Sequence, residues 1–457
     1  MTKFQSINPS TYKSLGDVEI SSDLEIKEKV ALAHKAKQNW RDIGLQNRIQ
    51  LLKNAFAEFE NRKDELALLQ TQEMGMPITD SIDDIVGDFS YANWYFDNAE
   101  KYLSPETTFE SSTEIHQVFY EPIGVIVSIT PWNFPFANFI WACLQSLIAG
   151  NTVVLKHSEE CPLVGKLIEE VLTKHLPKGV FNEVYGAGDV GDKLTNENVN
   201  MITFTGSTKT GKYLYEKAGK KFIRAVMELG GSALGIIFED ANLETAIPNV
   251  CGNRLANQGQ CCDGLKRLIV HESKFEEVSK KLAELFKNKK VGSAEDKSTE
   301  MGPLVSKRQL DLLESQVKDA IENGAKVLAG GKSLEQELGG AYFQPTVLTN
   351  ITKDMRVWTE EVFGPVLPII SFKTDDEAIK IANETRYGLG SYIYTSSKER
   401  ADKVSKELQT GMVSVNSTNY VIPQNPFGGY KDSGMGREHG KYGFHEVTQI
   451  KVISKNK

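Results

Sequence analysis

Cysteine is scarce in this sequence and is not arranged for cross-linking or metal binding. The 457 residues contain five cysteines, none in a C-x-x-C spacing: Cys143, Cys161, Cys251, Cys261 and Cys262. An odd number without that spacing, in a chain of this size, argues against a disulfide framework and against a zinc site. We therefore expect no metal and a reducing compartment.

Positive charge is not in excess, and no apolar run is long. The formal net charge of -8 argues against a nucleic-acid-binding surface. The longest apolar stretch, residues 136–150, is interrupted by Asn138 and Gln145 and is too short to span a bilayer, so it predicts a buried helix. The first residues lack the apolar segment of a secretion signal. These features predict a cytoplasmic protein without a membrane or nucleic-acid partner.

A G-x-G-x-x-G fingerprint after a strand is also missing, although the middle of the chain has the pattern of a parallel sheet. Short runs rich in β-branched residues alternate there with helical stretches. The predicted strands are 125–129, 152–155, 201–204 and 223–227, and the predicted helices are 135–149, 163–175 and 207–218. This alternation is typical of βαβ units, whose functional sites lie beyond the carboxyl ends of the strands.

The flanking segments extend this pattern. Apolar residues at helical spacing predict helices over 23–40 and 46–74, and residues 115–120 predict a strand outside the main sheet. After Gly231 a second α/β domain is predicted, separated from the first by a tight turn at Gly230-Gly231. Its predicted elements are the helices 243–258 and 274–288, the strand 268–271, and further segments at 325–328, 378–384 and 412–415.

The run Asn257-Gln258-Gly259-Gln260-Cys261-Cys262 is the strongest candidate for chemistry. A polar turn that contains glycine precedes the cysteines, so a sulfur there can face a cleft. A thiolate is a strong nucleophile, and a carbonyl carbon is its natural target. A buried structural cysteine is the alternative.

Two polar residues follow predicted strands and could assist such a nucleophile. Asn133 comes just after the strand at 125–129, and its amide could donate to an oxyanion together with the Cys262 backbone N–H. Glu228 ends another strand beside Gly230, where a carboxylate has room to act as a general base. A turn asparagine and a salt-bridged glutamate are the structural alternatives.

Three further pairs suit a dinucleotide. Gly206 and Ser207 open a predicted helix, whose N-terminus offers free N–H groups to a phosphate. Lys156 and Glu159 follow a strand and could hold a ribose, and a carboxylate there favours NAD over NADP. The third pair, Glu361 and Phe363, could hold a second ribose and pack on a flat ring. A capped helix, a solvated charge pair and a core Phe are the respective alternatives.

Taken together, these motifs resemble the aldehyde dehydrogenase superfamily, the NAD(P)-dependent enzymes that oxidise aldehydes to acids. The likeness covers essentially the whole chain, including the segments 426–434 and 436–438. The resemblance makes Cys262 the nucleophile, Asn133 the oxyanion donor and Glu228 the base that activates water. The residues that it assigns to bound NAD, with NADP possible, are Trp132, Lys156, Glu159, Gly206, Ser207, Leu229, Glu361 and Phe363.

The resemblance implies an α/β fold of two Rossmann-like parallel α/β domains plus a small β oligomerisation arm. The NAD-binding domain would comprise 1–108 and 123–230, the catalytic domain 231–430, and the arm with the C-terminal tail 109–122 and 431–457. The arm would comprise the strands at 115–120 and 449–454. An arm of this kind pairs strands between subunits, so we expect a homodimer or homotetramer.

The substrate is predicted to be a small-molecule aldehyde with an apolar aliphatic or aromatic body. Bacterial succinate-semialdehyde dehydrogenase-like enzymes look nearest, but those carry an arginine where this chain has Trp141, and some carry a second where it has Ala256. Burying a substrate carboxylate without a cation is costly. The predicted apolar tunnel and its neighbours are Phe134, Trp141, Cys261, Asp263, Val421, Ile422 and Phe427.

Other functions stay open. Arg254, Lys266 and Arg267 lie near the nucleophile in sequence, so succinate semialdehyde remains an alternative substrate. Asp263 would instead attract a cationic aminoaldehyde. A CoA-acylating enzyme is a third possibility, but relatives of that kind lack the base at the Glu228 position. A catalytically silent paralogue is disfavoured because nucleophile, base and oxyanion donor are all present.

Overall fold

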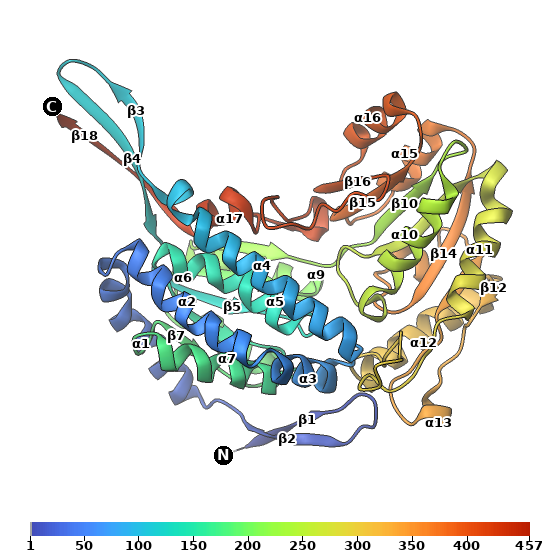
Figure 1. Ribbon diagram of the computed structural model, residues 1–457, viewed down its shortest axis with the longest axis horizontal. Helices are drawn as coiled ribbons and strands as arrows, with labels where there is room; N and C mark the ends of the chain where they lie inside the picture. The colour runs from blue at the N-terminus through green and yellow to red at the C-terminus, as the bar shows by residue number, and fades with distance from the viewer. Residues whose placement is uncertain (1) are drawn as a thin grey trace.

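The computed structural model describes residues 2–457 and consists of two lobes and a projecting arm (Figure 1). One lobe is built on a six-stranded sheet, the other on a seven-stranded sheet, and the arm is a three-stranded sheet. Within the described residues, no helix has both the length and the apolar character needed to cross a bilayer. The α/β architecture predicted from the sequence is confirmed.

The six-stranded sheet carries the strands that were predicted in the middle of the chain. Its order is β17(Gly434–Met435), β9(Arg224–Glu228), β8(Met201–Thr205), β5(Val125–Ile129), β6(Thr152–Lys156) and β7(Phe181–Glu183). All neighbours are parallel except β17, which runs antiparallel to β9. The apolar, β-branched runs of β5 and β6 are buried because helices cover both faces of a parallel sheet.

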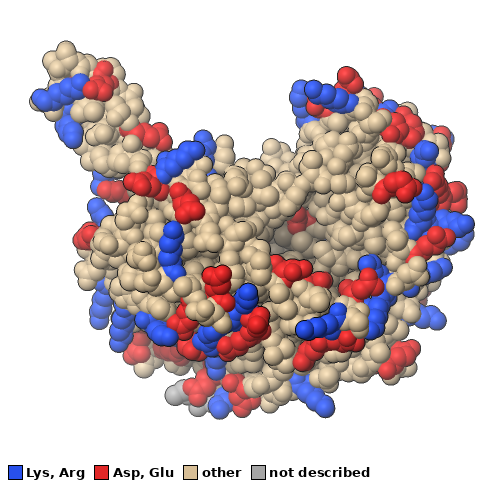
Figure 2. Space-filling model, in the orientation of Figure 1, with Lys and Arg blue, Asp and Glu red and all other residues tan. Residues whose placement is uncertain are grey.

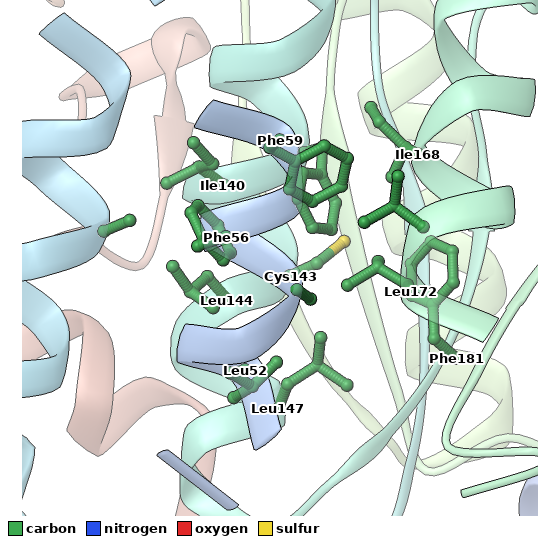
Figure 3. Close-up of a cluster of buried hydrophobic side chains, with 14 of the residues drawn as sticks. Leu52, Phe56, Phe59, Ile140, Cys143, Leu144, Leu147, Ile168, Leu172 and Phe181 are labelled. Atoms are coloured by element: carbon green, nitrogen blue, oxygen red, sulfur yellow. The ribbon is translucent and has the colours of Figure 1, made fainter. Parts of the chain in front are cut away.

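Helices pack on both faces of this sheet, with α2, α4 and α7 in front in Figure 1. Those of the first lobe are α1(Asp23–Asp42), α2(Leu45–Asn61), α3(Lys63–Met74), α4(Ile78–Leu103), α5(Pro135–Phe139), η1(Ile140–Leu144), α6(Gln145–Ala149), α7(Pro162–His175), α8(Gly188–Asn196) and α9(Thr208–Lys221). Figure 3 shows Phe56 of α2 beside Ile140 and Leu144 in the core, with Phe59 on the side of Ile168. Each such fully buried side chain contributes roughly 1.5–3 kcal/mol.

Two predicted helices differ in detail from the structure. The helix predicted over 46–74 is divided at Arg62, which has φ -105° and ψ 16°. The break lets α2 pack against α7 while α3 packs against α4. The helix predicted over 135–149 contains the π-helical segment η1, a feature that often marks functional sites. The sequence analysis also did not predict the N-terminal hairpin of β1(Lys3–Ile7) and β2(Ser14–Glu19).

The second lobe follows the predicted alternation after Gly231. Its sheet has the order β12(Lys326–Ala329), β13(Thr346–Thr349), β14(Val366–Phe372), β11(Leu265–His271), β10(Ala233–Ile237), β15(Gly390–Tyr394) and β16(Met412–Val415). Its longer helices are α10(Leu243–Leu255), α11(Phe275–Lys287), α12(Lys307–Glu322), α15(Asp375–Asn383) and α16(Lys398–Glu407). The predicted helix 243–258 is wrong beyond Leu255, where a short 3-10 segment, η2(Ala256–Gly259), replaces it.

The arm consists of β18(Thr448–Asn456), β4(Glu114–Pro122) and β3(Glu106–Glu110), paired antiparallel in that order. It extends away from the first lobe, and the C-terminus lies at its tip (Figure 1). The predicted strands at 115–120 and 449–454 are therefore confirmed as strands of one sheet. The predicted division into domains stays a prediction, and two strands do not respect its boundaries. β3 crosses the boundary placed after residue 108. β17 was assigned to the arm and C-terminal tail but belongs to the first lobe's sheet.

Candidate active site

A cavity of about 720 Å³ lies between the two lobes, at the carboxyl ends of the first lobe's strands. Figure 2 shows the hollow, with acidic side chains inside it and at its rim. Nearly all predicted site residues line this cavity: Trp132, Asn133, Phe134, Trp141, Gly206, Ser207, Glu228, Leu229, Cys261, Cys262, Asp263, Glu361, Phe363, Val421 and Phe427. Three predicted residues, Lys156, Glu159 and Ile422, are not part of its wall.

The loop before Cys262 has an unusual backbone. Asn257 and Gln258 adopt positive φ values of 47° and 55°, which side-chain-bearing residues rarely do, and Gly259 follows at 76°. A Cβ on Gly259 would lie 2.3 Å from the carbonyl oxygen of Gly364. This conformation turns the chain out of α10 and into the cavity, where Cys262 is partly exposed. Backbone strain of this kind is concentrated at functional sites.

Cys261 is placed differently from its neighbour. Its Sγ donates to Asp263 Oδ1 at 3.0 Å. The hydrogen bond with Cys262, burial and the Asp263 carboxylate raise the pKa of the Cys261 thiol well above its usual range. A thiol that stays protonated is a poor nucleophile, so the geometry favours Cys262.

A network of amides ties Asn133 to the loop that carries Cys262. Its Nδ2 donates to the carbonyl oxygen of Gln260 at 3.0 Å, and its Oδ1 accepts from Asn138 Nδ2 at 3.4 Å. The backbone carbonyl of Asn133 accepts from Asn257 Nδ2 at 2.6 Å. The bond from Asn138 identifies Oδ1 as the acceptor, so Nδ2 keeps a second hydrogen for a ligand in the cavity that Asn133 lines.

Glu228 ends β9 in a desolvated position. It is 3% exposed, and neither carboxylate oxygen has a hydrogen-bond partner within residues 2–457. Burial, followed by the charges of Glu438 and Cys262, raises the pKa of Glu228 well above its ordinary range. A Cβ on Gly428 would lie 2.8 Å from Glu228 Oε1, so that glycine leaves the carboxyl its space. An unpaired carboxyl with a raised pKa at a cavity wall is typical of a general base.

The β8–α9 turn lines one part of the cavity. Ser207 is the N-cap of α9, and its Oγ accepts from Thr210 N at 3.3 Å. Leu229 packs against Gly211 of the same helix, where a Cβ would lie 2.3 Å from its Cδ2. The helix N-terminus therefore opens on the cavity with its dipole favouring an anion. Gly206 and Ser207 line this part.

Glu361 is the centre of a second polar group. Its Oε1 accepts from Gly231 N at 3.0 Å and from Lys266 Nζ at 2.8 Å, while Oε2 keeps lone pairs for a ligand. Trp132 and Phe363 lie nearby, edge to face at 5.5 Å between ring centroids. These groups could hold ribose hydroxyls and a flat ring, as the sequence analysis expected.

Lys156 and Glu159 form an ion pair outside the cavity wall. The Lys156 ammonium is almost fully buried and lies 3.4 Å from Glu159 Oε2. Burial lowers the pKa of Lys156, with the Glu159 charge acting in the opposite direction. The pair follows β6 and lies near α8, since a Cβ on Gly191 would lie 3.6 Å from Lys156 Cδ.

The basic residues near the nucleophile face inward. Arg254 is fully buried and donates to the carbonyl oxygens of Val362 and Gly364. Lys266 Nζ donates to the carbonyl oxygens of Cys262 at 2.6 Å and Gly231 at 2.9 Å, besides its bond to Glu361. Arg267 donates to the carbonyl oxygen of Ser232 at 3.1 Å and 3.2 Å. These three side chains stabilise the surrounding backbone through hydrogen bonds to its carbonyls, and none of them lines the cavity.

Aromatic side chains form part of the cavity wall near Cys262. Trp141 lies in η1, 5.2 Å from Phe427 and 5.6 Å from Tyr91 between ring centroids. Phe427, Trp141 and Val421 belong to the apolar cluster that contacts Cys262. These apolar side chains lie around Cys262, and their use as a substrate pocket stays a prediction.

The sequence analysis missed several wall residues. They are Asp83, Asp84, Asp88 and Tyr91 of α4, Asn249 and Asn253 of α10, and also Gln309, Tyr392, Tyr420 and Glu438. Burial raises the pKa of Glu438 to about 7. Asp84, Asp88 and Tyr91 are spaced four and three residues apart, which places them on one face of a helix. That spacing is the feature of the sequence from which a polar helix face at the cavity could have been predicted.

Comparisons with known proteins agree with this geometry. The NADP-dependent succinate-semialdehyde dehydrogenase of Escherichia coli is 34% identical over 449 residues, covering 98% of this chain and 93% of that protein. The mitochondrial succinate-semialdehyde dehydrogenase of Oryza sativa is 35% identical and covers 98% and 85%. The NAD+ complex of an aldehyde dehydrogenase from Bacillus cereus superposes with a TM-score of 0.96 at 34% identity, covering 100% and 93%. The family model described as "Aldehyde dehydrogenase family" matches residues 1–453, and the chain belongs to this family.

Proposed function

We propose that the protein oxidises an aldehyde to a carboxylic acid with NAD or NADP as the electron acceptor. The observation that carries the proposal is the convergence of a partly exposed cysteine, a positioned amide and an unpaired buried carboxyl on one cavity. Family membership supports the same reaction class. The proposed roles of these residues follow from their contacts.

Cys262 is the proposed nucleophile. Its thiolate adds to the aldehyde carbon and gives a thiohemiacetal whose oxygen carries the developing negative charge. The free Nδ2 hydrogen of Asn133 and the backbone N–H of Cys262 are the proposed donors to that oxygen. A well-placed donor of this kind contributes about 3 kcal/mol to transition-state stabilisation.

The dinucleotide would lie between the α9 N-terminus and Glu361. Gly206 and Ser207 would receive the pyrophosphate, and Glu361 with its free Oε2 would hold the nicotinamide ribose beside Phe363. Trp132 and Leu229 would complete that wall, and Lys156 and Glu159 would hold the adenosine ribose. When bound, the nicotinamide would supply the hydride acceptor for oxidation of the thiohemiacetal to a thioester.

Glu228 is the proposed base for the second half of the reaction. Once its carboxyl has lost its proton, it takes a proton from a water molecule, and the resulting hydroxide attacks the thioester on Cys262 and releases the acid. The unpaired oxygens and the room left by Gly428 support this role. General base catalysis contributes typically ~10²–10⁴-fold to the rate. The same base disfavours CoA as the acyl acceptor.

NAD is the proposed preferred cofactor. The Glu159 carboxylate beside Lys156 would oppose a 2′-phosphate on the adenosine ribose. Among the relatives, the Bacillus cereus structure is an NAD+ complex and the Escherichia coli enzyme is named as NADP-dependent. A comparison of kcat/KM with the two cofactors tests this preference.

The proposed substrate has an apolar body and no carboxylate. The wall of the described cavity contains aromatic rings and no lysine, arginine or histidine. Succinate semialdehyde is the alternative, supported by the names of relatives at about one-third identity. Its carboxylate would be buried without a cation, which is costly.

A homodimer or homotetramer is the proposed assembly. The arm exposes apolar side chains, with Ile450 65% and Val452 63% exposed on β18 and Phe109 47% exposed on β3. Such a row on a projecting sheet is a typical interaction surface. Light scattering or sedimentation of the purified protein tests the assembly.

The central experiment measures NADH or NADPH formation by purified protein with a panel of aldehydes, with and without CoA. We expect a CoA-independent rate with at least one aldehyde, and none from a Cys262→Ser variant. A rate that requires CoA would support the acylating alternative. Full activity in Cys262→Ser would overturn the proposed mechanism.

A further inference from the structure

The cavity wall is strongly one-sided in charge. Its acidic residues are Asp83, Asp84, Asp88, Glu228, Asp263, Glu361 and Glu438, and the described wall contains no basic side chain. Glu228 and Glu361 have roles in the proposed reaction, and Glu438 lies beside Glu228. The carboxylates of α4 and Asp263 have no such role, so their presence at the substrate end requires another explanation.

Asp88 is the most informative of these residues. It is 4% exposed, and its Oδ2 has no hydrogen-bond partner within the described chain. One turn before it, Asp84 accepts from Gln70 Nε2 at 2.9 Å. A buried carboxylate oxygen without a donor costs free energy unless a ligand satisfies it.

Tyr91 connects this acidic group to the nucleophile. It follows Asp88 by one turn of α4, its hydroxyl is buried without a partner among residues 2–457, and its ring stacks on Trp141 at 5.6 Å. Trp141 in turn belongs to the apolar cluster around Cys262. Burial, followed by the charges of Asp88 and Asp263, raises the pKa of the Tyr91 hydroxyl, so both carboxylates act on this residue.

The carboxyls of this group have raised pKa values because they are buried close together. Burial and the smaller effect of the Asp80 charge together raise the pKa of Asp84 to about 6, against the lowering effect of its hydrogen bond from Gln70. Burial, followed by the charge of Asp84, raises the pKa of Asp88 well above its ordinary range. A cation between them would relieve both the repulsion and the unsatisfied oxygen. Aromatic rings beside the carboxylates add a second source of attraction for a cation.

We propose that the physiological substrate is an aldehyde that carries a protonated amine at the far end of a short apolar chain. The aldehyde carbon would lie at Cys262, the methylenes against Trp141 and Phe427, and the ammonium against Asp88, Asp84 and the Tyr91 hydroxyl. The unpaired acceptors Asp88 Oδ2 and Tyr91 Oη suit a primary ammonium, which has three N–H donors. This inference rests on the proposed function and specifies its substrate class.

The test compares aldehydes that differ only at the far end. We would measure kcat/KM for 3-aminopropanal against butanal, and for 4-aminobutanal against pentanal, so that an ammonium replaces a methyl group of similar size. Succinate semialdehyde supplies the anionic case, and 4-trimethylammoniobutanal supplies a cation without N–H donors. We expect each primary amine to exceed its alkanal at least tenfold, with succinate semialdehyde poorer still.

Variants then locate the recognition. Asp88→Asn should lower the ratio of kcat/KM for amine over alkanal roughly tenfold to hundredfold, as expected for removing one charge of a desolvated pair. Asp84→Asn should lower the same ratio. If Asp88→Asn does not fold, Asp84→Asn alone tests whether the carboxylates of α4 recognise the ammonium. The matched control is Asp97→Asn, an exposed aspartate of the same helix paired with Lys53, which should leave the ratio unchanged.

The outcomes separate this inference from the proposed function. Alkanals oxidised as well as their amine counterparts, or an amine preference that survives in both variants, would overturn the inference and leave aldehyde oxidation standing. A preference for the trimethylammonium compound over the primary amine would overturn the role of the N–H donors. If no aldehyde in the panel were oxidised with either cofactor, the proposed function itself would fail.

Discussion

Asn133 donates from its side-chain Nδ2 to the backbone carbonyl of Gln260 at 3.0 Å, and Gln260 lies two residues before Cys262, the proposed nucleophile. The proposed oxyanion donor is thereby tied to the loop that carries Cys262. This bond restrains the donor relative to that loop, and the amides of Asn138 and Asn257 restrain Asn133 further. Substitution of Asn133 therefore affects both the charge stabilisation and the position of the thiol.

Asn133→Ala should lower kcat/KM by about 10²–10³-fold, the typical effect of removing one oxyanion-hole donor. Steady-state kinetics with the best aldehyde of the panel measures this. Asn54→Ala is the control, because Asn54 lies on the exposed face of α2 and bonds only to Gln50 among the side chains described. Equal kinetics in Asn133→Ala and the control would contradict the assigned role.

Glu228→Gln should allow acylation and slow the release of acid. The amide keeps the shape of the carboxyl but cannot take a proton from water, so kcat should fall ~10²–10⁴-fold. Rapid mixing should show a burst of NADH close to one equivalent, followed by slow turnover. Glu216→Gln, in an exposed pair with Lys220, is the matched control. Loss of the burst would assign Glu228 to the first half of the reaction instead.

The same residue should set the acidic limb of the pH profile. Burial raises the pKa of Glu228 above its ordinary value of 4.5, so the protonated, inactive form persists to higher pH than for an exposed glutamate. The deprotonated base increases as pH rises through this shifted pKa, and kcat should rise with it. In Glu228→Gln this limb should disappear. A native kcat that is already constant from pH 5 upward would contradict the assignment.

Two glycines of neighbouring segments should respond oppositely to alanine. Gly259→Ala adds a Cβ 2.3 Å from the Gly364 carbonyl at φ 76°, and we expect a loss of about 1–3 kcal/mol with a misplaced thiol. Gly252 lies exposed in α10 with open space at its Cβ, so Gly252→Ala should stabilise by roughly 0.4–1 kcal/mol. Urea unfolding with thiol labelling of Cys262 checks both. Equal stability of the two variants would show that the loop conformation is not strained.

Lys266→Met should weaken dinucleotide binding. Lys266 joins Glu361 to the carbonyls of Gly231 and Cys262, so its loss frees the Glu361 carboxylate and leaves two carbonyls without this donor. We expect the Kd for NAD to rise about tenfold or more and the protein to lose about 1–3 kcal/mol of stability. Fluorescence titration and thermal unfolding measure the two effects. Lys281→Met, on the surface of α11, should change neither quantity.

The sequence predicted the parallel sheet well because its signals are local. The apolar, β-branched composition of 125–129 and 152–156 is enough to predict buried strands. The residues that follow each strand then indicate where the cavity edge lies. The break at Arg62 and the end of α10 at Leu255 were not predictable in the same way. Both depend on contacts with distant elements, and Asn257 and Gln258 adopt backbone conformations that their own residue types disfavour.

The acidic face of α4 shows a second kind of limit. Asp84, Asp88 and Tyr91 are ordinary polar residues on a surface helix until Trp141 and the Cys262 loop are placed opposite them. Their spacing in the sequence is visible, but their convergence on the nucleophile arises only from the packing of α4 against the helix that contains η1. The same limit applies to Arg254, Lys266 and Arg267. Their side chains donate to backbone carbonyls inside the protein, and those carbonyls come near them only when the chain is folded.

The pairing of β17 with β9 has a consequence for synthesis of the protein. Gly434 is the register partner of Glu228, and Ser433 accepts from Leu229 N at 3.0 Å through its carbonyl and donates from Oγ to Gly230 at 2.8 Å. A nascent chain still on the ribosome before residue 433 has emerged would already contain nucleophile, amide and base. It would lack the β17 pairing and the Ser433 bonds that hold β9 and Glu228 in place. The Cys262 thiol would therefore be synthesised before the proposed base is positioned.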